Sequence, residues 1–426
     1  MANQNLGKAK KAKNDEFYTQ LADIDKEMQA YIDYNPDVFR DKTILLPCDD
    51  PKTSNFTKFF AANFQLFGIK KLISTSYAPD AKKAKYDIAP SLFPDEENDP
   101  KYDPSKWQTK GKIFVLDRDV NGDSHINIDD LQWKYLEGDG DFRSREVMSL
   151  RDEADIIITN PPFSMFREFL KWIMDAGKQF SIIGNMNAIT YKEVFPLIKD
   201  NKIWLGNGFS AGNAFFATPN AEKYKDGVLQ SNGLVKFRNC CWYTNIEHGR
   251  RHQPLTLMTM ADNKKFSPHK SIKENGYQHY DNYDAIEVPY TDAIPSDYDG
   301  VMGVPISFLD KYCPEQFEIV NANDYRTSEN VRIKPHGLIK DKEATITIFD
   351  GQNAERERER EREETSTHNV RTDMHQTNCL LREVTDGTLT VNANTHVSLS
   401  ASYYDMVARP VIAGREVYRR VFIRKN

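Results

Sequence analysis

The feature that most constrains the fold of this chain is an apolar strand that runs directly into a rigid turn. Residues 154–159 (ADIIIT) contain three consecutive isoleucines, the pattern of a strand that is buried on both faces. The turn at residues 160–163 (NPPF) cannot continue the strand, because proline has no N–H to donate to a sheet. A helix is predicted over residues 163–176. This order places the turn at the carboxyl end of a parallel sheet, the edge where open α/β folds bind ligands.

A complete strand–helix–strand unit precedes this strand and indicates the fold class. An apolar run at 43–47 (TILLP) is followed by a polar turn, an aromatic helical stripe at 56–67 and a second apolar run at 71–76 (KLISTS). Such a succession is the first unit of a doubly wound sheet, so the predicted fold class is α/β. The other predicted elements are a helix over 16–34, strands over 112–116, 180–184 and 202–205, and a helix over 191–199, with the α/β domain ending near Gly206.

The texture of the sequence changes after Gly206 and divides the chain. The residues that follow are rich in Tyr, Asn, Asp and His without long helical periodicity, which is typical of a mixed, loop-rich region. A strict Glu-Arg alternation over 355–363 is of low complexity, and we interpret it as a solvated helix or a linker. The predicted parts are a basic arm over 1–14, the α/β domain over 15–206, a loop-rich region over 207–353, a low-complexity and polar insertion over 354–413 and a basic strand over 414–426.

The composition indicates in which cellular compartment the protein is expected and which class of binding partner it favours. No apolar run is long enough to cross a bilayer, and the lysine-rich start has no apolar segment of the kind that secretory signals contain. The five cysteines lack the spacing of a metal site, so we expect reduced thiols and a cytoplasmic location. The formal net charge of −6 does not favour a nucleic-acid partner. Local charge matters more than the sum, however, and residues 248–252 (HGRRH) form a compact basic cluster.

Residues 119–130 (DVNGDSHINIDD) are close to a calcium-binding loop. Oxygen-bearing side chains occupy most of the ligand positions, and Ile126 stands at the apolar one. Ser124 replaces the glycine that the sharp turn requires, and the preceding residues 112–116 indicate a strand where a calcium loop needs a helix. We therefore interpret this segment as a turn-rich loop and predict no metal site.

The turn at 160–163 carries groups suited to methylating an amine on a planar substrate. The lone pair of such an amine is delocalised into the ring, and acceptors that hold both of its hydrogens localise the lone pair on nitrogen. Asn160 offers a side-chain carbonyl and Pro161 a backbone carbonyl, while Pro162 helps to fix the backbone. Phe163 offers a flat face on which a base can stack. The alternative is a plain strand-ending turn, since Asn and Pro are both turn residues.

Seven stretches together resemble the EcoRI-type adenine-specific DNA methyltransferases. They are residues 13–20 (KNDEFYTQ), 48–56 (CDDPKTSNF), 138–144 (GDGDFRS), 159–163 (TNPPF), 184–188 (GNMNA), 241–252 (CWYTNIEHGRRH) and 299–305 (DGVMGVP). The resemblance covers most of residues 8–323 and the last dozen, and it is far more specific than the tetrad alone. It implies a Rossmann-like methyltransferase domain, then a DNA-recognition region, with S-adenosylmethionine as cofactor and a flipped-out adenine of double-stranded DNA as target. It also implies either a restriction endonuclease that acts on the same site or an orphan methylase.

The same resemblance implies a set of cofactor residues. Residues 17–19 match the motif that contacts the methionine end of the cofactor, and residues 49–51 match the turn where a carboxylate faces its ammonium or sulfonium. Residues 141–142 match an acid–aromatic pair near its adenine. Two departures are that residues 48–55 lack the usual glycines and that the second strand lacks the acid that grips the ribose. The implied cofactor residues are Phe17, Tyr18, Thr19, Asp49, Asp50, Pro51, Asp141 and Phe142.

The basic cluster is the predicted DNA contact. Arg250 and Arg251, with His248 beside them, are expected to position phosphates, whereas a structural surface loop is the alternative. Two rival functions remain: methylation of cytosine N4 or of a protein glutamine, and a non-catalytic DNA- or calcium-binding protein with a degenerate methyltransferase fold. The length and polarity of residues 207–426 favour DNA over a short peptide, and the intact tetrad argues against a loss of catalysis.

Overall fold

The computed structural model divides the chain into two compact units. Unit 1 comprises residues 1–189, 196–254 and 309–315, and unit 2 comprises residues 190–195, 255–308 and 316–426. The residues that the structure describes are 17–51, 54–78, 99–209, 213–218, 221, 224, 228–281, 283–322, 346–350, 395–399, 410–413 and 415–426. The predicted basic arm and most of the predicted insertion lie outside these residues. Among the helices of the described residues, none is long and apolar enough to cross a membrane.

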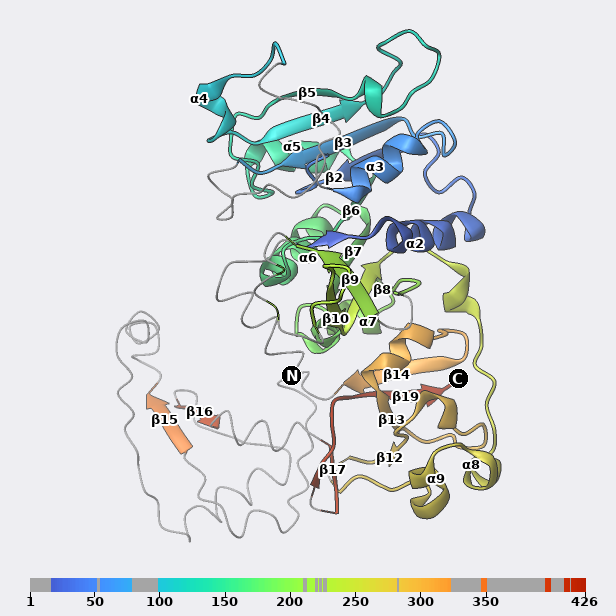
Figure 1. Cartoon of the computed structure of the whole chain (residues 1–426). Coiled ribbons are helices and arrows are strands. Elements are labelled where there is room, and N and C mark those ends of the chain that lie inside the picture. The colour runs from blue at the N-terminus through green and yellow to red at the C-terminus, as the bar shows by residue number, and fades with distance from the viewer. Residues whose placement is uncertain are drawn as a thin grey trace. The chain divides into compact units, whose positions relative to one another are not determined.

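Unit 1 is built on an eight-stranded mixed sheet whose four central strands are parallel (Figure 1). In sheet order, the parallel strands are β3 (Lys71–Ser76), β2 (Thr43–Leu46), β6 (Ile156–Thr159) and β7 (Gln179–Asn185). Beyond β3 the sheet continues with β4 (Lys112–Leu116) and β5 (Gln132–Tyr135), which run antiparallel to their neighbours. Beyond β7 it continues with β11 (Cys240–Thr244) and β8 (Trp204–Leu205), joined by antiparallel pairing.

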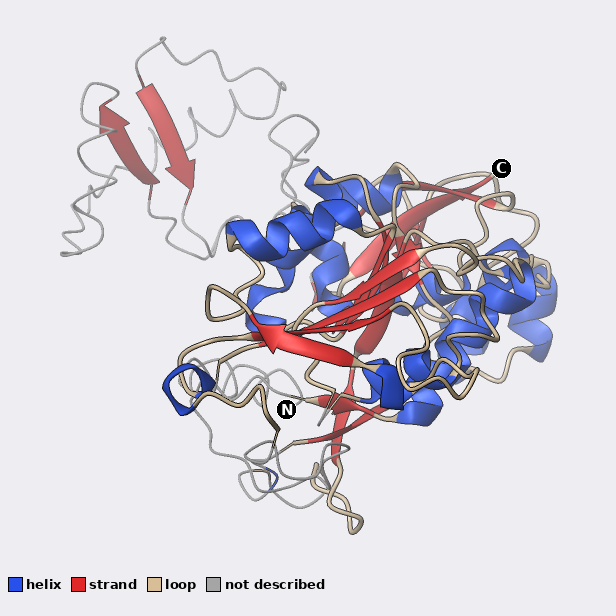
Figure 2. Ribbon diagram, turned by 90° about the horizontal axis from the view of Figure 1, so that it is seen from above, coloured by secondary structure: helices blue, strands red, loops and turns tan. Residues whose placement is uncertain are grey.

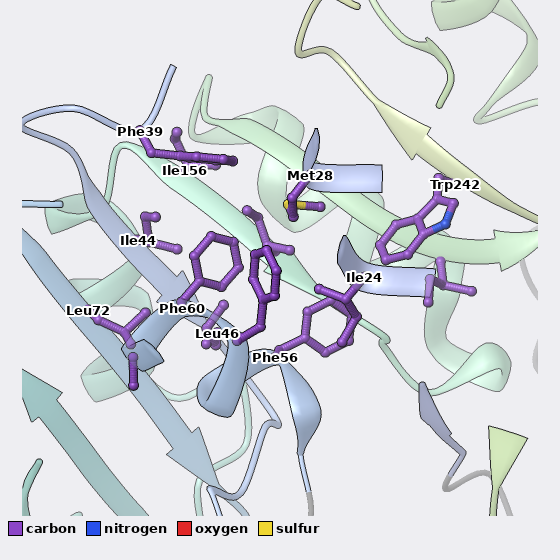
Figure 3. Close-up of a cluster of buried hydrophobic side chains, with 14 of the residues drawn as sticks. Ile24, Met28, Phe39, Ile44, Leu46, Phe56, Phe60, Leu72, Ile156 and Trp242 are labelled. Atoms are coloured by element: carbon purple, nitrogen blue, oxygen red, sulfur yellow. The ribbon is translucent and has the colours of Figure 1, made fainter. Parts of the chain in front are cut away.

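Alternate residues of the central strands point to opposite faces of this sheet, and each face is covered by helices (Figure 2). On one face, Ile44, Leu46 and Ile156 share a core with α2 (Leu21–Tyr34) and α3 (Asn55–Ala62). Figure 3 shows this core, in which Phe56 and Phe60 lie near Ile44 and Leu46, and Trp242 lies at the other side of Phe56, with ring centroids 6.0 Å apart. The remaining helices of the unit are α4 (Pro104–Trp107), α5 (Arg145–Glu153), α6 (Phe166–Asp175) and, at its border, α7 (Phe195–Lys199), with short 3-10 turns η3 (Ile128–Asp130), η4 (Phe163–Met165), η5 (Met186–Thr190) and η8 (Gly249–His252).

A small three-stranded sheet also belongs to unit 1. Its strands are β1 (Tyr18–Thr19), β9 (Asn213–Ala217) and β10 (Val235–Arg238), all antiparallel. The sequence predicted one helix over 16–34, but the helix begins only at Leu21. Residues 18–19 are extended because they pair with Ala217 and Phe216, a long-range contact that helical periodicity does not reveal.

The mixed α/β class is confirmed, and most central strands lie within one or two residues of the predicted ranges. The domain boundary expected near Gly206 differs from the structure. Strand β11 inserts between β7 and β8, so the large sheet takes a strand from beyond that boundary, and unit 1 extends to Pro254 and includes residues 309–315. The boundary of unit 1 is set by hydrogen bonds between strands that are distant in sequence. The local composition does not report such bonds.

Unit 2 contains a four-stranded sheet that is built partly from the end of the chain. Its order is β12 (Ile286–Glu287), β13 (Met302–Pro305), β19 (Arg420–Lys425) and β14 (Phe317–Ala322). The predicted basic strand near the end is therefore confirmed in β19, which lies between two partners. Unit 2 also holds α8 (Met260–Phe266), α9 (Lys270–Asn275), the turn η9 (Thr291–Ala293), and the strand pairs β15 (Ile346–Asp350) with β16 (Thr395–Leu399) and β17 (Val411–Ile412) with β18 (Arg415–Glu416). The turn η10 (Ile306–Lys311) is divided, with its last three residues assigned to unit 1.

Candidate functional site

The candidate site lies where the strand order of the large sheet reverses. From β2 the chain first adds β3 on one side and later adds β6 on the other. The carboxyl ends of β2 and β6 therefore meet, and such a switch point is where open α/β sheets bind ligands. The Thr159 hydroxyl at the end of β6 donates to the Pro47 carbonyl after β2, at 2.8 Å. The two turns predicted from the sequence, 48–51 and 160–163, are thus neighbours.

Asn160 has its side-chain amide fixed in one orientation. Its Nδ2 donates to the backbone carbonyl of Phe17 at 2.6 Å. A carbonyl oxygen can only accept, so Nδ2 must face Phe17 and Oδ1 must face away from it. Oδ1 is buried and has no hydrogen-bond partner among the described residues. An unpartnered buried acceptor is costly, and its presence here indicates a place for a donor from a ligand.

Phe163 lies in a cluster of aromatic rings next to this amide. Its ring centroid is 5.7 Å from that of Phe17, 6.2 Å from Phe216 and 6.4 Å from Phe237. Phe17 directly precedes β1, and the other two rings come from β9 and β10, so the small sheet supplies the supports. Phe163 itself stays partly exposed and begins the 3-10 turn η4. The site can therefore offer a supported ring to a flat ligand.

Asp49 places a second unpartnered acceptor at this edge. The carboxylate is buried, Oδ1 accepts from the Ser54 hydroxyl at 2.7 Å, and Oδ2 has no partner among the described residues. Burial raises the pKa of Asp49 from 3.8 to about 7, because desolvation outweighs the hydroxyls of Thr159 and Ser54, and Asp50 adds to the rise. The Thr159 proton is donated to Pro47, which leaves Oδ2 available to a cationic or donor group of a ligand.

The turn at residues 48–55 contains no glycine, and Cys48 takes the backbone conformation that favours one. Cys48 has φ +66°, the left-handed region that favours glycine. Cys48 therefore holds a backbone conformation that glycine adopts at lower cost. Asp50 is partly exposed and its backbone oxygen accepts from the Ser54 N–H, while Pro51 is buried, so the predicted turn is compact.

Residues 141–142 reach the end of β3, but their side chains differ in role. Asp141 is partly exposed and accepts from Arg143, which holds the pKa of the carboxyl below its usual range. The Phe142 ring is fully buried and packs on Phe169 and Trp172, with centroids 5.0 and 5.6 Å away. The Phe142 ring is therefore part of the core beside α6, and the place of this residue next to the adenine of a cofactor stays a prediction.

Tyr77 was missed by the sequence reasoning. It follows β3, and the pKa of its hydroxyl is raised by burial and by the neighbouring Cys48 and Asp141, while the backbone of Phe142 hydrogen-bonds to it. The hydroxyl thus joins the turn after β2 to the segment around 141. Its position directly after a strand next to the switch point was the available signal.

The residues that were predicted to contact DNA make contacts with other residues of unit 1. His248 is buried, its Nε2 lies 2.9 Å from the Leu205 carbonyl, and burial lowers its pKa. Arg251 is buried and donates to Glu247 and Asn201, both at 2.8 Å, and its guanidinium lies 4.0 Å from the Trp204 ring centre. These internal contacts favour the structural alternative for His248 and Arg251, and their contact with phosphate stays a prediction.

Arg250 is also engaged by protein groups. Its guanidinium donates to the Asn207 carbonyl and pairs with Asp310, and its side chain is 29% exposed. The neutralised charge fits the structural alternative better than phosphate contact.

Glu27 is a buried carboxylate that the sequence gave no reason to single out. It accepts from Tyr31 at 2.6 Å and from the backbone N–H groups of Asn207 and Gly208 at 3.0 and 3.1 Å. Burial raises its pKa from 4.5 to about 7. A Cβ at Gly206 would overlap its Oε1, so glycine is required there for the close approach. The residue anchors the segment after β8.

The segment that resembles a calcium loop satisfies its own carboxylates. Asp119 accepts from the N–H groups of Gly122 and Ser124, and Asp130 accepts from those of Val120, Asn121 and Asn127. Within the described ranges there is no group of three or more His, Cys, Asp or Glu side chains placed to hold a metal ion. The turn-rich interpretation agrees with this hydrogen bonding.

Comparisons with known proteins bear on the whole chain. A family model described as "Adenine-specific methyltransferase EcoRI" matches residues 5–425. The chain is 43% identical over 324 residues to the Type II methyltransferase M.EcoRI of Escherichia coli, covering 75% of this chain and 89% of that protein. It is 31% identical over 340 residues to the Type II methyltransferase M.MpnI of Mycoplasma pneumoniae (77% and 89%), and 31% identical over 354 residues to the Type II methyltransferase M.MgeORF184P of Mycoplasma genitalium (82% and 95%). No solved structure matches.

Proposed function

Because the chain belongs to the EcoRI family of adenine-specific methyltransferases, we propose that it transfers a methyl group from S-adenosylmethionine to the N6 amine of adenine in double-stranded DNA. In this proposal the large sheet of unit 1 is a Rossmann-like catalytic fold, and residues after β8 that lie outside it contribute to DNA recognition. The relatives' names as Type II methyltransferases support a place beside a restriction endonuclease of the same specificity.

The single observation that carries the proposal is the held amide of Asn160. With Nδ2 fixed by the Phe17 carbonyl, Oδ1 is a preorganised acceptor at the switch point. An exocyclic amine that donates a hydrogen to Oδ1 loses conjugation with its ring, and its nitrogen lone pair becomes nucleophilic. Charge then develops on the nitrogen, and fixed dipoles stabilise it without reorganising. The Pro161 carbonyl is the proposed second acceptor, held by the two consecutive prolines.

The exposed side of Phe163 is the proposed stacking surface for the base. Adenine inside a duplex cannot reach a turn at a sheet edge, so the nucleotide must leave the stack. The rings of Phe17, Phe216 and Phe237 hold Phe163 from behind, so stacking does not require the phenyl ring to be ordered first.

The residues at the switch point fit S-adenosylmethionine. The bound cofactor supplies a methyl group activated by a sulfonium. Three buried oxygens without partners among the described residues come from the predicted site: Thr19 Oγ1, Asp49 Oδ2 and Asn160 Oδ1. A carboxylate oxygen that lacks a partner suits an ammonium or sulfonium group, and a hydroxyl suits a polar neighbour. Asp49 and Thr19 are therefore proposed to hold the cofactor, with residues 50, 51, 18 and 141 around them.

The test is base-resolved detection of methyl transfer. The purified chain is incubated with plasmid DNA and labelled cofactor, and modified bases are mapped by sequencing. We expect N6-methyladenine at one short sequence, no transfer with Asn160→Ala, and cofactor binding by that variant within a few-fold of the wild type. The control is Asn63→Ala, which removes a side-chain amide that donates to the Phe59 carbonyl at the end of α3. Activity in Asn160→Ala, or label on cytosine or on protein glutamine in place of adenine, would overturn the proposal.

A further inference from the structure

Residues 17–19 form a short strap that runs past the two functional turns. Its strand, β1, is two residues long and forms only two residue pairs with β9. So short a ladder by itself fixes a backbone weakly, because each end frays, and packing of the Phe17 ring against Phe216 and Phe237 holds the first residue in addition. Three side-chain amides add to it: Asn160 donates to the Phe17 carbonyl at 2.6 Å, Asn55 donates to the Thr19 carbonyl at 2.7 Å, and Gln20 makes a long bond of 3.5 Å to the Tyr18 carbonyl. Asn55 thus holds the strap two residues from the point where Asn160 grips it.

Asn55 is itself placed by rigid structure. It is the first residue of α3, whose preceding residue Ser54 caps the helix by accepting from the Phe56 N–H at 3.1 Å. The same Ser54 hydroxyl donates to Asp49. Two consecutive side chains at the start of α3 therefore hold the buried carboxylate and the strap.

The orientation of Asn160 depends on where the strap lies. If the Phe17 carbonyl moves out of reach, nothing else among the described contacts requires Nδ2 to face it. The amide can then turn over and present N–H groups where the acceptor Oδ1 belongs. Two donors facing each other repel, so a turned amide disfavours an amine substrate.

We propose that Asn55 is a positioning residue for methyl transfer: by holding the Thr19 carbonyl, it keeps the Phe17 carbonyl where it orients the Asn160 amide. This inference rests on the proposed function. In this arrangement Asn160, the proposed acceptor for the base, and Thr19, a proposed cofactor residue, are linked by hydrogen bonds to the same three-residue segment, 17–19. Asn55 acts through Asn160 and does not touch the substrate.

The experiment compares Asn55→Ala and Asn55→Asp with the wild type under saturating cofactor and DNA. Alanine removes the donor, and aspartate keeps the shape but can only accept, so it cannot bind the Thr19 carbonyl. Both variants should lose kcat by about 10- to 100-fold, the scale on which small misplacements act. The KM for DNA should change by less than about threefold, because Asn55 is uncharged and its amide is engaged by the Thr19 carbonyl, whereas DNA affinity comes mainly from cationic contacts with phosphates. Asn63→Ala, which removes the same kind of bond at the other end of α3, should keep full activity.

The outcomes separate this inference from the proposed function. Wild-type activity with an unchanged kcat in Asn55→Asp would overturn the positioning role and leave the proposed function standing. Absence of DNA methylation by the wild type would overturn the proposed function first. If Asn55→Ala does not fold, Asn55→Asp decides, and its melting temperature must match that of Asn63→Ala within a few degrees. A rise in KM with an unchanged kcat would also contradict the role, since it would report a contact with DNA.

Discussion

The buried carboxylate of Asp49 should make cofactor binding depend on pH. A cationic group binds the ionised form, and a pKa of about 7 means that about one Asp49 in ten is ionised at pH 6 and about nine in ten at pH 8. The affinity for S-adenosylmethionine should therefore rise about tenfold between these values through Asp49 alone, and it should level off above pH 8. The groups that set this pKa are burial first, then the Thr159 and Ser54 hydroxyls, and the charge of Asp50.

Titration calorimetry at pH 6, 7 and 8 measures this dependence. The amino group of the cofactor titrates in the same range, so the decisive quantity is the difference between the wild type and Asp49→Asn. The asparagine variant should bind weakly and should lack the tenfold rise. Glu27→Gln is the matched control: it removes the other carboxylate with a pKa of about 7, which anchors residues 207–208 and not the turn after β2. An equal rise in the wild type and Asp49→Asn would refute the assignment of Asp49 to the cofactor.

Four further substitutions test the roles of residues in unit 1. The folded pKa of Glu27 lies above its unfolded value of 4.5, so the stability that Glu27 contributes is present below about pH 4.5 and is lost as pH rises to about 7. Asp49 contributes a loss of the same sign. In urea denaturation, Glu27→Gln should therefore remove about 3 kcal/mol of the wild-type fall and leave the part that is due to Asp49. Phe142→Ala should lower the free energy of unfolding by about 3–5 kcal/mol, because the ring is fully buried, whereas Phe163→Ala should lose methylation with a smaller change in melting temperature. Arg251→Ala should lower the free energy of unfolding by about 1–3 kcal/mol and leave the salt dependence of DNA binding unchanged. A shallower salt slope with normal stability would support the phosphate role instead.

The parts of the site that sequence reasoning found are those set by local pattern. Three isoleucines followed by two prolines define a buried strand and its end, whatever surrounds them, so the position of Asn160 at a sheet edge was predictable. The strand–helix–strand unit likewise placed Asp49 beside it. The acceptor roles proposed for Asn160 and Asp49 depend on these positions at the carboxyl ends of β6 and β2.

The parts that sequence reasoning missed are set by contacts between distant residues. The amide of Asn160 meets a carbonyl 143 positions away, and Glu27 meets N–H groups some 180 positions away. Helix α2 carries both polar and apolar residues, so from the sequence Glu27 is expected to be a solvent-exposed charge. It is buried because residues 207–208, which follow β8, donate to its carboxylate. For the same reason Arg251 looked available to phosphate, since its partners Asn201 and Trp204 lie in another segment.

Strand β11 has a consequence for any attempt to excise the catalytic part of this protein. A fragment ending at Gly206, where the sequence changes texture, would contain β7 without the neighbour that pairs with it along five residues. The bared edge would expose unpaired N–H and C=O groups beside apolar side chains, a template for association with other chains. The two strands also meet late during synthesis, because Thr244 contacts Phe180 across 64 positions. During synthesis the edge of β7 stays unpaired until β11 has been made. The need for chaperones during folding should therefore depend on the time between the synthesis of these two strands.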